Sequence, residues 1–194
     1  METDAALQSM QAIYAAVRAK DSARVEAIVA GDPTLAIFAA AVADDGAQVE
    51  TLLATNRSLI SSFSPDGWTP LHLAAHFAAE HAVRSLLNKG ADVNARSSNV
   101  LQNRPLHAAV AGRAAGVAKI LIERGANVNA RQHWGWTALH AAAQSGDVEL
   151  ARVLVDAGAD VNVRADNQQR PLDIALSKGQ QGMVDFLEAN GAAL

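Results

Sequence analysis

The fold of this chain is decided by one short stretch, GWTPLHLAA, at Gly67–Ala75. Thr69 followed by Pro70 is a favourable helix start, because a threonine oxygen can accept a hydrogen bond from a free backbone N–H and proline fits the first helical position. Two apolar stripes at helical spacing follow, in residues 71–75 and 83–87. The stretch therefore predicts a helix, a turn and a second, antiparallel helix.

The same pattern returns along the chain at a nearly constant interval. The pair Leu71 and His72 recurs as Leu-His after 35 and then 33 residues, and as Leu-Asp after a further 33. A second motif, GADVN or GANVN, begins at Gly90, Gly125 and Gly158. A glycine there ends the second helix, because it readily adopts the positive φ of a helix C-terminus. Two motifs with one period identify a protein of stacked repeats.

These motifs resemble the ankyrin repeat. The resemblance is carried by Gly67–Ala75 and by GWTALHAA at Gly135–Ala142, and it covers residues 64–194. Weaker echoes lie upstream, at Ile13–Ala16 and Ile37–Ala41. The resemblance implies an all-α solenoid, in which helix-turn-helix units joined by β-hairpin-like loops are stacked in a row.

The length of 194 residues corresponds to about one domain. We expect a single ankyrin repeat domain over residues 1–194, with degenerate N-terminal helix pairs in 1–63, three well-formed repeats in 64–163 and a C-terminal capping repeat in 164–194. Glu188 stands where the other units carry an apolar residue, and the first helices are also partly polar. This pattern predicts a cap at each end and a complete solenoid.

The composition agrees with a folded helical chain. Hydrophobic residues make up 50% and charged residues 19%, close to ordinary globular values, and alanine, the strongest helix former, supplies 43 of the 194 residues. With 16 basic and 20 acidic residues the net charge is −4, so the positive excess that favours nucleic acid is missing. The lack of cysteine excludes disulfides and thiolate metal sites.

No targeting signal and no apolar run long enough to span a bilayer is found in the sequence. We therefore predict a cytoplasmic monomer with no cofactor, no nucleic acid and no membrane insertion; export as a host-directed effector is the alternative. Arginine outnumbers lysine by 12 to 4, which together with the many alanines favours a bacterial source.

Three histidines invite a metal-site hypothesis that their spacing disfavours. His72, His107 and His140 occupy one position in successive repeats, so neighbours lie roughly 10 Å apart, whereas zinc binds its ligands at about 2.0–2.1 Å. We expect each of them to tie its helix to a loop through a hydrogen bond to the backbone. His76 lies one helical turn after His72, but the glutamate of a zinc protease is missing. Nucleophile elbow, P-loop and dinucleotide motifs are also missing, which predicts a non-catalytic protein.

The resemblance implies that partners bind the concave surface, which ankyrin repeats form from hairpin tips and the exposed side of the first helices. Tryptophan dominates binding energy at interfaces, and all three tryptophans map to this surface. A structural role, covering the hairpin, is the alternative at Trp68 and Trp136, whereas the pattern does not require tryptophan at Trp134. The predicted partner-binding residues are Trp68, His76, Phe77, Asn103, His133, Trp134, Trp136, Gln144 and Ser145.

We therefore predict a scaffold that binds a protein partner. A binder of small molecules or nucleic acid, and a cryptic enzyme or metal protein, are the alternatives. Which partner is bound does not follow from the repeats, because the family defines a scaffold and leaves the target to variable positions.

One hairpin and two helix starts depart from the pattern. Asn94 and Pro105 are two residues further apart than their counterparts, and the extra residues fall within Ser97–Asn103, so this hairpin should bulge. Arg104 and Arg170 replace the capping threonine, which predicts weaker helix starts.

A row of arginines recurs in the loops, at Arg96, Arg131 and Arg164. We expect local ion pairs with Asp92 and Asp160, four residues earlier. Contact with an acidic partner is the alternative.

Overall fold

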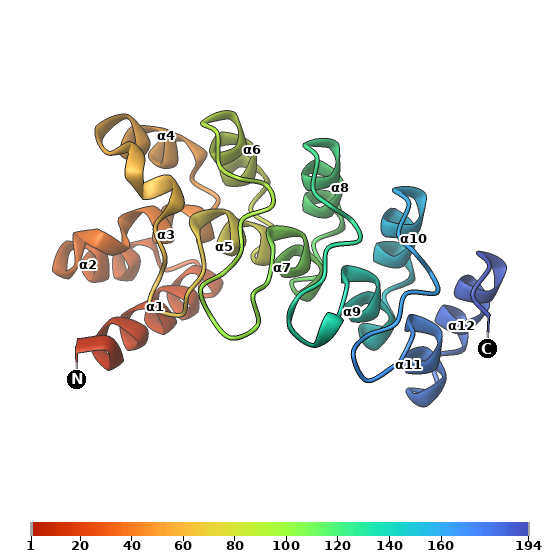
Figure 1. Ribbon diagram of the computed structural model, residues 1–194. Helices are drawn as coiled ribbons and strands as arrows, with labels where there is room; N and C mark the ends of the chain where they lie inside the picture. The colour runs from red at the N-terminus through yellow and green to blue at the C-terminus, as the bar shows by residue number, and fades with distance from the viewer. Residues whose placement is uncertain (1, 194) are drawn as a thin grey trace.

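The computed structural model describes residues 2–193, which form helices and connecting loops without a strand. The helices make six successive pairs, and the termini lie at opposite ends of the row (Figure 1). The predicted all-α solenoid is thereby confirmed. The first helices of the pairs are α1 (Glu2–Arg18), α3 (Ala36–Val42), α5 (Pro70–His76), α7 (Pro105–Ala111), α9 (Ala138–Ser145) and α11 (Pro171–Ser177).

The second helices form another row, in which α4, α6, α8 and α10 stand side by side (Figure 1). From α4 onward, long loops lead from each second helix to the next first helix, whereas α2 and α3 are joined only by Asp32 and a short 3-10 turn. Short 3-10 turns interrupt three of the connections, at Pro33–Leu35, Arg57–Ser61 and His133–Gly135. The second helices are α2 (Ser22–Gly31), α4 (Gly46–Thr55), α6 (Glu80–Asn88), α8 (Ala115–Glu123), α10 (Val148–Asp156) and α12 (Gln181–Ala189).

Leucines at equivalent positions of the repeats form the centre of one continuous apolar cluster. Alanines beside them let the helices approach closely, and burial stabilises each leucine by roughly 1.5–3 kcal/mol. The period seen in the sequence is therefore the period of the core. The buried leucines are Leu71, Leu106, Leu139 and Leu172 in first helices, and Leu86, Leu121, Leu154 and Leu187 in second helices.

Asparagines of the GADVN motif connect consecutive loops. Asn94 donates from Nδ2 to the Gly125 carbonyl at 3.1 Å and accepts the Asn127 backbone N–H at 2.9 Å. Asn129 and Asn162 make the same two bonds to the loop that follows them. Since each carboxamide satisfies one free donor and one free acceptor, the motif repeats for a structural reason.

Consecutive hairpin tips are also joined, in each case by one hydrogen bond between a backbone N–H and a backbone carbonyl. This contact fixes the spacing of the tips along the solenoid, and with it the geometry of the surface that they form. The N–H of Ser98 donates to the Gly67 carbonyl at 2.8 Å, that of His133 to Leu101 at 3.0 Å, and that of Asp166 to Trp134 at 3.0 Å.

The predicted bulge in Ser97–Asn103 is confirmed. Ser97 donates its N–H to the Asn103 carbonyl at 2.8 Å, which closes the loop at its base. The two extra residues extend the tip, so that Val100 is 80% exposed.

The histidine column also has the predicted role. His72 Nε2 lies 2.9 Å from the Asn103 carbonyl, and His107 and His140 reach the carbonyls of Ala130 and Gln169 at 3.1 Å. A carbonyl only accepts, so Nε2 carries the proton in each case. Each histidine thus ties its helix to the following hairpin.

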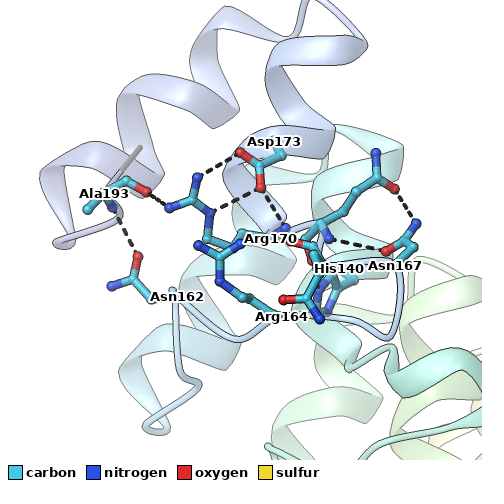
Figure 2. A network of polar contacts seen from close by, with 9 residues as sticks. His140, Asn162, Arg164, Asn167, Arg170, Asp173 and Ala193 are labelled. Carbon is cyan, nitrogen blue, oxygen red and sulfur yellow. Dashed lines mark hydrogen bonds and ion pairs between the residues drawn. The ribbon is translucent and has the colours of Figure 1, made fainter.

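The weak helix starts expected at Arg104 and Arg170 are a half-correct prediction. The threonine oxygen is missing, but the reciprocal bond is kept, because the Arg104 N–H donates to His107 Nδ1 at 3.2 Å and the Arg170 N–H to Asp173 Oδ2 at 2.8 Å. Figure 2 shows that the Arg170 guanidinium also binds Asp173 and the Ala193 carbonyl. The charged pair replaces the capping threonine in the last repeat.

The ion pairs expected for the arginine row are a wrong prediction. Asp92 and Asp160 accept backbone N–H groups of their own loops at 2.8 and 2.9 Å. Arg96 binds the Gln102 side chain, and Arg131 and Arg164 bind backbone carbonyls. These carboxylates bind N–H groups of their own turns in preference to the arginines, because the backbone holds a neighbouring N–H in place.

Candidate functional site

Two tryptophans occupy matching positions directly before the capping threonines of α5 and α9. The ring centroid of Trp68 lies 5.9 Å from that of His72, and that of Trp136 lies 5.6 Å from that of His140. Both indoles are half-buried. Each covers the start of its helix, so the alternative of a structural role applies to part of each ring.

Around Trp68 the chain forms an N-terminal cluster of Tyr14, Arg18, Trp68, His76 and Phe77. His76 lies edge-on to Trp68 at 5.4 Å and to Phe77 at 5.3 Å. From α1, the Tyr14 ring packs on Phe77 at 5.2 Å, and the Arg18 guanidinium lies 5.3 Å from the centroid of the Phe77 ring. The first helix therefore covers this part of the surface.

A hydrogen bond holds the cover in place. The Tyr14 hydroxyl donates to Asp66 Oδ2 at 2.8 Å, and Ser64 donates to the other oxygen of the same carboxylate. Burial, together with the charge of Asp66, raises the pKa of Tyr14, so the hydroxyl remains a donor. Burial lowers the pKa of His76, which keeps the ring neutral inside the cluster.

A second concave site, the C-terminal pocket, is a cavity of about 820 Å³ bounded by three hairpin tips and by α7 and α9. Unlike the N-terminal cluster, it is open, and no described segment of the chain covers it as α1 covers Phe77. The pocket is lined by Leu101, Asn103, His107, Ala111, Gln132, Trp134, Trp136, Ala141, Gln144, Asp166 and Asn167.

Trp134 stands at the rim of this pocket and is 59% exposed. Its indole contacts the ring of His133 edge-on, with centroids 4.6 Å apart. The backbone of Trp134 is left-handed, with φ 62° and ψ 20°, a conformation that disfavours a bulky residue by about 1 kcal/mol or more. The turn at this hairpin tip therefore presents a large apolar ring to solvent.

Two polar groups of the pocket differ in their exposure. The Asp166 carboxylate is exposed and lies close to Gly135, where an added side chain would collide with it. Within residues 2–193 no ion pair or hydrogen bond engages that carboxylate. Asn103 is only 7% exposed, and its Oδ1 is buried without a hydrogen-bond partner in the same range.

The imidazole at the base of the pocket is neutral. Burial lowers the pKa of His107 to about 4, because the charged form would lose its hydration. Asp166 is then the one formally charged side chain among the described lining residues.

The predicted partner-binding residues separate into two groups. Trp68, His76 and Phe77 lie in the N-terminal cluster, where α1 contacts them. The others lie in or beside the C-terminal pocket: Asn103, Trp134, Trp136 and Gln144 line it, His133 contacts Trp134 edge-on, and Ser145 ends α9 with its hydroxyl bound to the Ala142 carbonyl.

Sequence reasoning missed the contribution of α1. The motifs assign neither Tyr14 nor Arg18 to the partner-binding surface. The signal was weak, because α1 belongs to the degenerate part of the chain. Tyr14 is, however, the single tyrosine, and Arg18 follows it by one helical turn, so both project from the same face of the helix.

Comparison with protein families gives one clear result. Residues 13–132 and 106–194 match a model of ankyrin repeats in three copies. No curated protein matches the chain. Over the described part of the chain, three metal-ligating side chains do not come together at any point, and none of the helices there is long and apolar enough to cross a membrane.

Proposed function

Because the chain belongs to the ankyrin repeat family, whose members are in general protein–protein interaction modules, we propose that it is a non-catalytic scaffold whose partner protein binds the concave surface. The exposed, strained Trp134 carries this proposal. Its apolar area stabilises little within the chain, whereas a buried tryptophan at an interface contributes strongly to affinity.

In this proposal the repeats of residues 64–163 supply the binding surface. The helix pairs of residues 1–63 and the repeat of residues 164–194 close the ends. The exposed Glu188 and the Arg170–Asp173 pair of the last repeat support a capping role, because a capping repeat carries a polar outer face. A monomeric state and a cytoplasmic location remain predictions from composition.

Photo-crosslinking tests the binding face. A benzophenone amino acid is introduced at Gln144, exposed on α9, and in a matched variant at Lys119, exposed on the outer helix α8. After irradiation in cells of the source organism, we expect a crosslinked protein from position 144 and none from position 119. Trp134→Ala should abolish the product. Equal products from both positions, or a product from 119 alone, would contradict binding by the concave face.

A further inference from the structure

We propose that the C-terminal pocket receives an arginine side chain of the partner protein. This inference rests on the proposed function and adds the chemistry of the group that is recognised. It follows from a comparison of the pocket with the N-terminal cluster, where the chain itself shows how such an aromatic surface is covered.

The N-terminal cluster combines three components. Aromatic rings line the concave side, a carboxylate at the hairpin tip, Asp66, accepts a hydrogen bond from the covering helix, and the guanidinium of Arg18 lies 5.3 Å from the centroid of the Phe77 ring. A cation within about 6 Å of an aromatic centroid is attracted by the ring. Helix α1 thus covers the cluster with a hydrogen-bond donor, the Tyr14 hydroxyl, and a cation, the Arg18 guanidinium, which belong to the same chain.

The C-terminal pocket has the rings and the carboxylate, but none of its described lining residues is a cation. Trp134 and Trp136 supply the aromatic surface, and Asp166 lies against the Gly135 between them. Two arginines of the loop row are engaged with backbone carbonyls, because Arg131 donates to the Arg164 carbonyl and Arg164 to the Gln168 carbonyl. A partner that completes the pocket must therefore bring the positive charge.

The exposed Asp166 carboxylate and the buried Asn103 carboxamide favour arginine among the possible occupants. An apolar side chain would bury the Asp166 carboxylate without a partner, which is costly. A guanidinium is planar, stacks on indole and carries five N–H donors, so it can bind Asp166 while its plane rests on a tryptophan. The buried carboxamide of Asn103, whose Oδ1 lacks a partner in residues 2–193, offers a further acceptor at the wall.

The test uses the full chain and four blocked tripeptides, acetyl-Gly-X-Gly-amide with X arginine, lysine, citrulline or leucine. The indole N–H resonances of the three tryptophans are followed by NMR and assigned with Trp134→Phe and Trp136→Phe. Trp68 is the internal reference, because Arg18 already covers its cluster. We expect the arginine peptide to shift Trp134 and Trp136 but not Trp68, and to bind at least fivefold more tightly than the citrulline peptide, its uncharged analogue.

Two variants with the same change in net charge separate the pocket from the rest of the surface. Asp166→Asn should weaken binding of the arginine peptide at least fivefold, whereas Asp156→Asn, exposed on the outer helix α10, should leave it unchanged. Binding of leucine or citrulline as tight as arginine, equal shifts at Trp68, no shift with any peptide, or no effect of Asp166→Asn would each overturn the proposal. If crosslinking from position 144 succeeds in those cases, the concave face still binds a partner and only the arginine assignment fails.

Discussion

The two ends of the concave surface start from the same motif, Gly-Trp-Thr, and reach different states. At residues 67–69 the tryptophan lies in a cluster that α1 covers, with Tyr14 and Arg18 packed on Phe77. At residues 135–137 it lines an open pocket, next to the exposed Trp134. A repeat motif therefore determines where a side chain lies, and the neighbouring element determines whether that side chain is available to a partner.

The largest expected effect concerns what both halves share, the buried histidines. Burial lowers the pKa values of His72 and His107 to about 4, below the ordinary value of about 6.5. Between these pH values the unfolded chain binds more protons than the folded chain. The contribution of the neutral histidines to the free energy of unfolding is therefore complete above about pH 6.5 and falls as the pH drops toward 4. We expect a loss of roughly 2–3 kcal/mol per histidine by pH 4.5.

Urea unfolding between pH 7 and 4.5, with NMR titration of both rings, measures this loss. Similar contributions from His72 and His107 would show that the histidine column is a common frame, and that the halves differ only in their cover. Ring titrations near 6.5 would contradict the neutral, buried state in either half.

The second prediction compares the removal of one aromatic ring from each half. Tyr14→Ala removes a half-buried ring and leaves the Asp66 carboxylate without its Tyr14 donor, so we expect the free energy of unfolding to fall by about 2–3 kcal/mol. Tyr14→Phe, which keeps the ring, should lose only about 1 kcal/mol. Urea denaturation at pH 7 measures both. A loss below about 0.5 kcal/mol for Tyr14→Ala would mean that α1 is not a structural cover.

The corresponding change in the open half is Trp134→Ala, the third prediction. We expect a stability loss below about 1 kcal/mol and a loss of partner affinity of about 2 kcal/mol or more. Trp134→Gly sharpens the comparison, because glycine adopts a positive φ without strain and should be more stable than the alanine variant by up to about 1 kcal/mol. Calorimetric unfolding measures the stability loss. Titration with the partner protein that crosslinking has identified measures the affinity loss. A large stability loss with unchanged affinity would identify Trp134 as a structural lid.

Most of the fold was predictable because it depends on local, repeated chemistry. The Thr-Pro start, the leucine column and the GADVN loop each act within one repeat or on the next one, so their period in the sequence is their period in space. The helix pairs of residues 1–63 lack these motifs. The contact between Tyr14 and Phe77 spans far more of the chain than one repeat, and no periodic signal announces it.

The position of the candidate site was predictable from the sequence. The exposure and the hydrogen-bond partners of its side chains were less predictable. Mapping the tips located Trp134 and Trp136, which line the pocket. It placed Asn103 on the surface, although this residue is 7% exposed. The ion pairs of the arginine row were predicted wrongly for a related reason. Spacing shows which charged residues are near each other, but the Asp92 and Asp160 carboxylates already accept backbone N–H groups of their own turns.

The smallest expected effect concerns the contacts between adjacent repeats. In the N-terminal half, Asp44 accepts the Ala82 N–H at 2.9 Å and binds His81 Nδ1 at 2.7 Å. The hydrogen bond and charge of Asp44 raise the pKa of the exposed His81. In the C-terminal half, Arg113 contacts the Ser145 carbonyl at 3.5 Å. We therefore expect the contact between repeats to depend on pH in the N-terminal half. The contact in the C-terminal half should not depend on pH, since arginine stays charged.

The sign for His81 is opposite to that of the buried histidines. Because its folded pKa is raised, the contribution of the His81–Asp44 pair is complete below the ordinary value of about 6.5 and is lost as the pH rises through the folded value. Asp44→Asn keeps an oxygen for the Ala82 N–H but removes the charge, so the pKa of His81 should fall and the difference in stability from the parent should shrink between pH 6 and 8. Arg113→Gln should change stability equally at both pH values. NMR titration of His81 and urea unfolding at the two pH values measure these changes, and an unaltered His81 titration in Asp44→Asn would show that this contact does not join the repeats in solution.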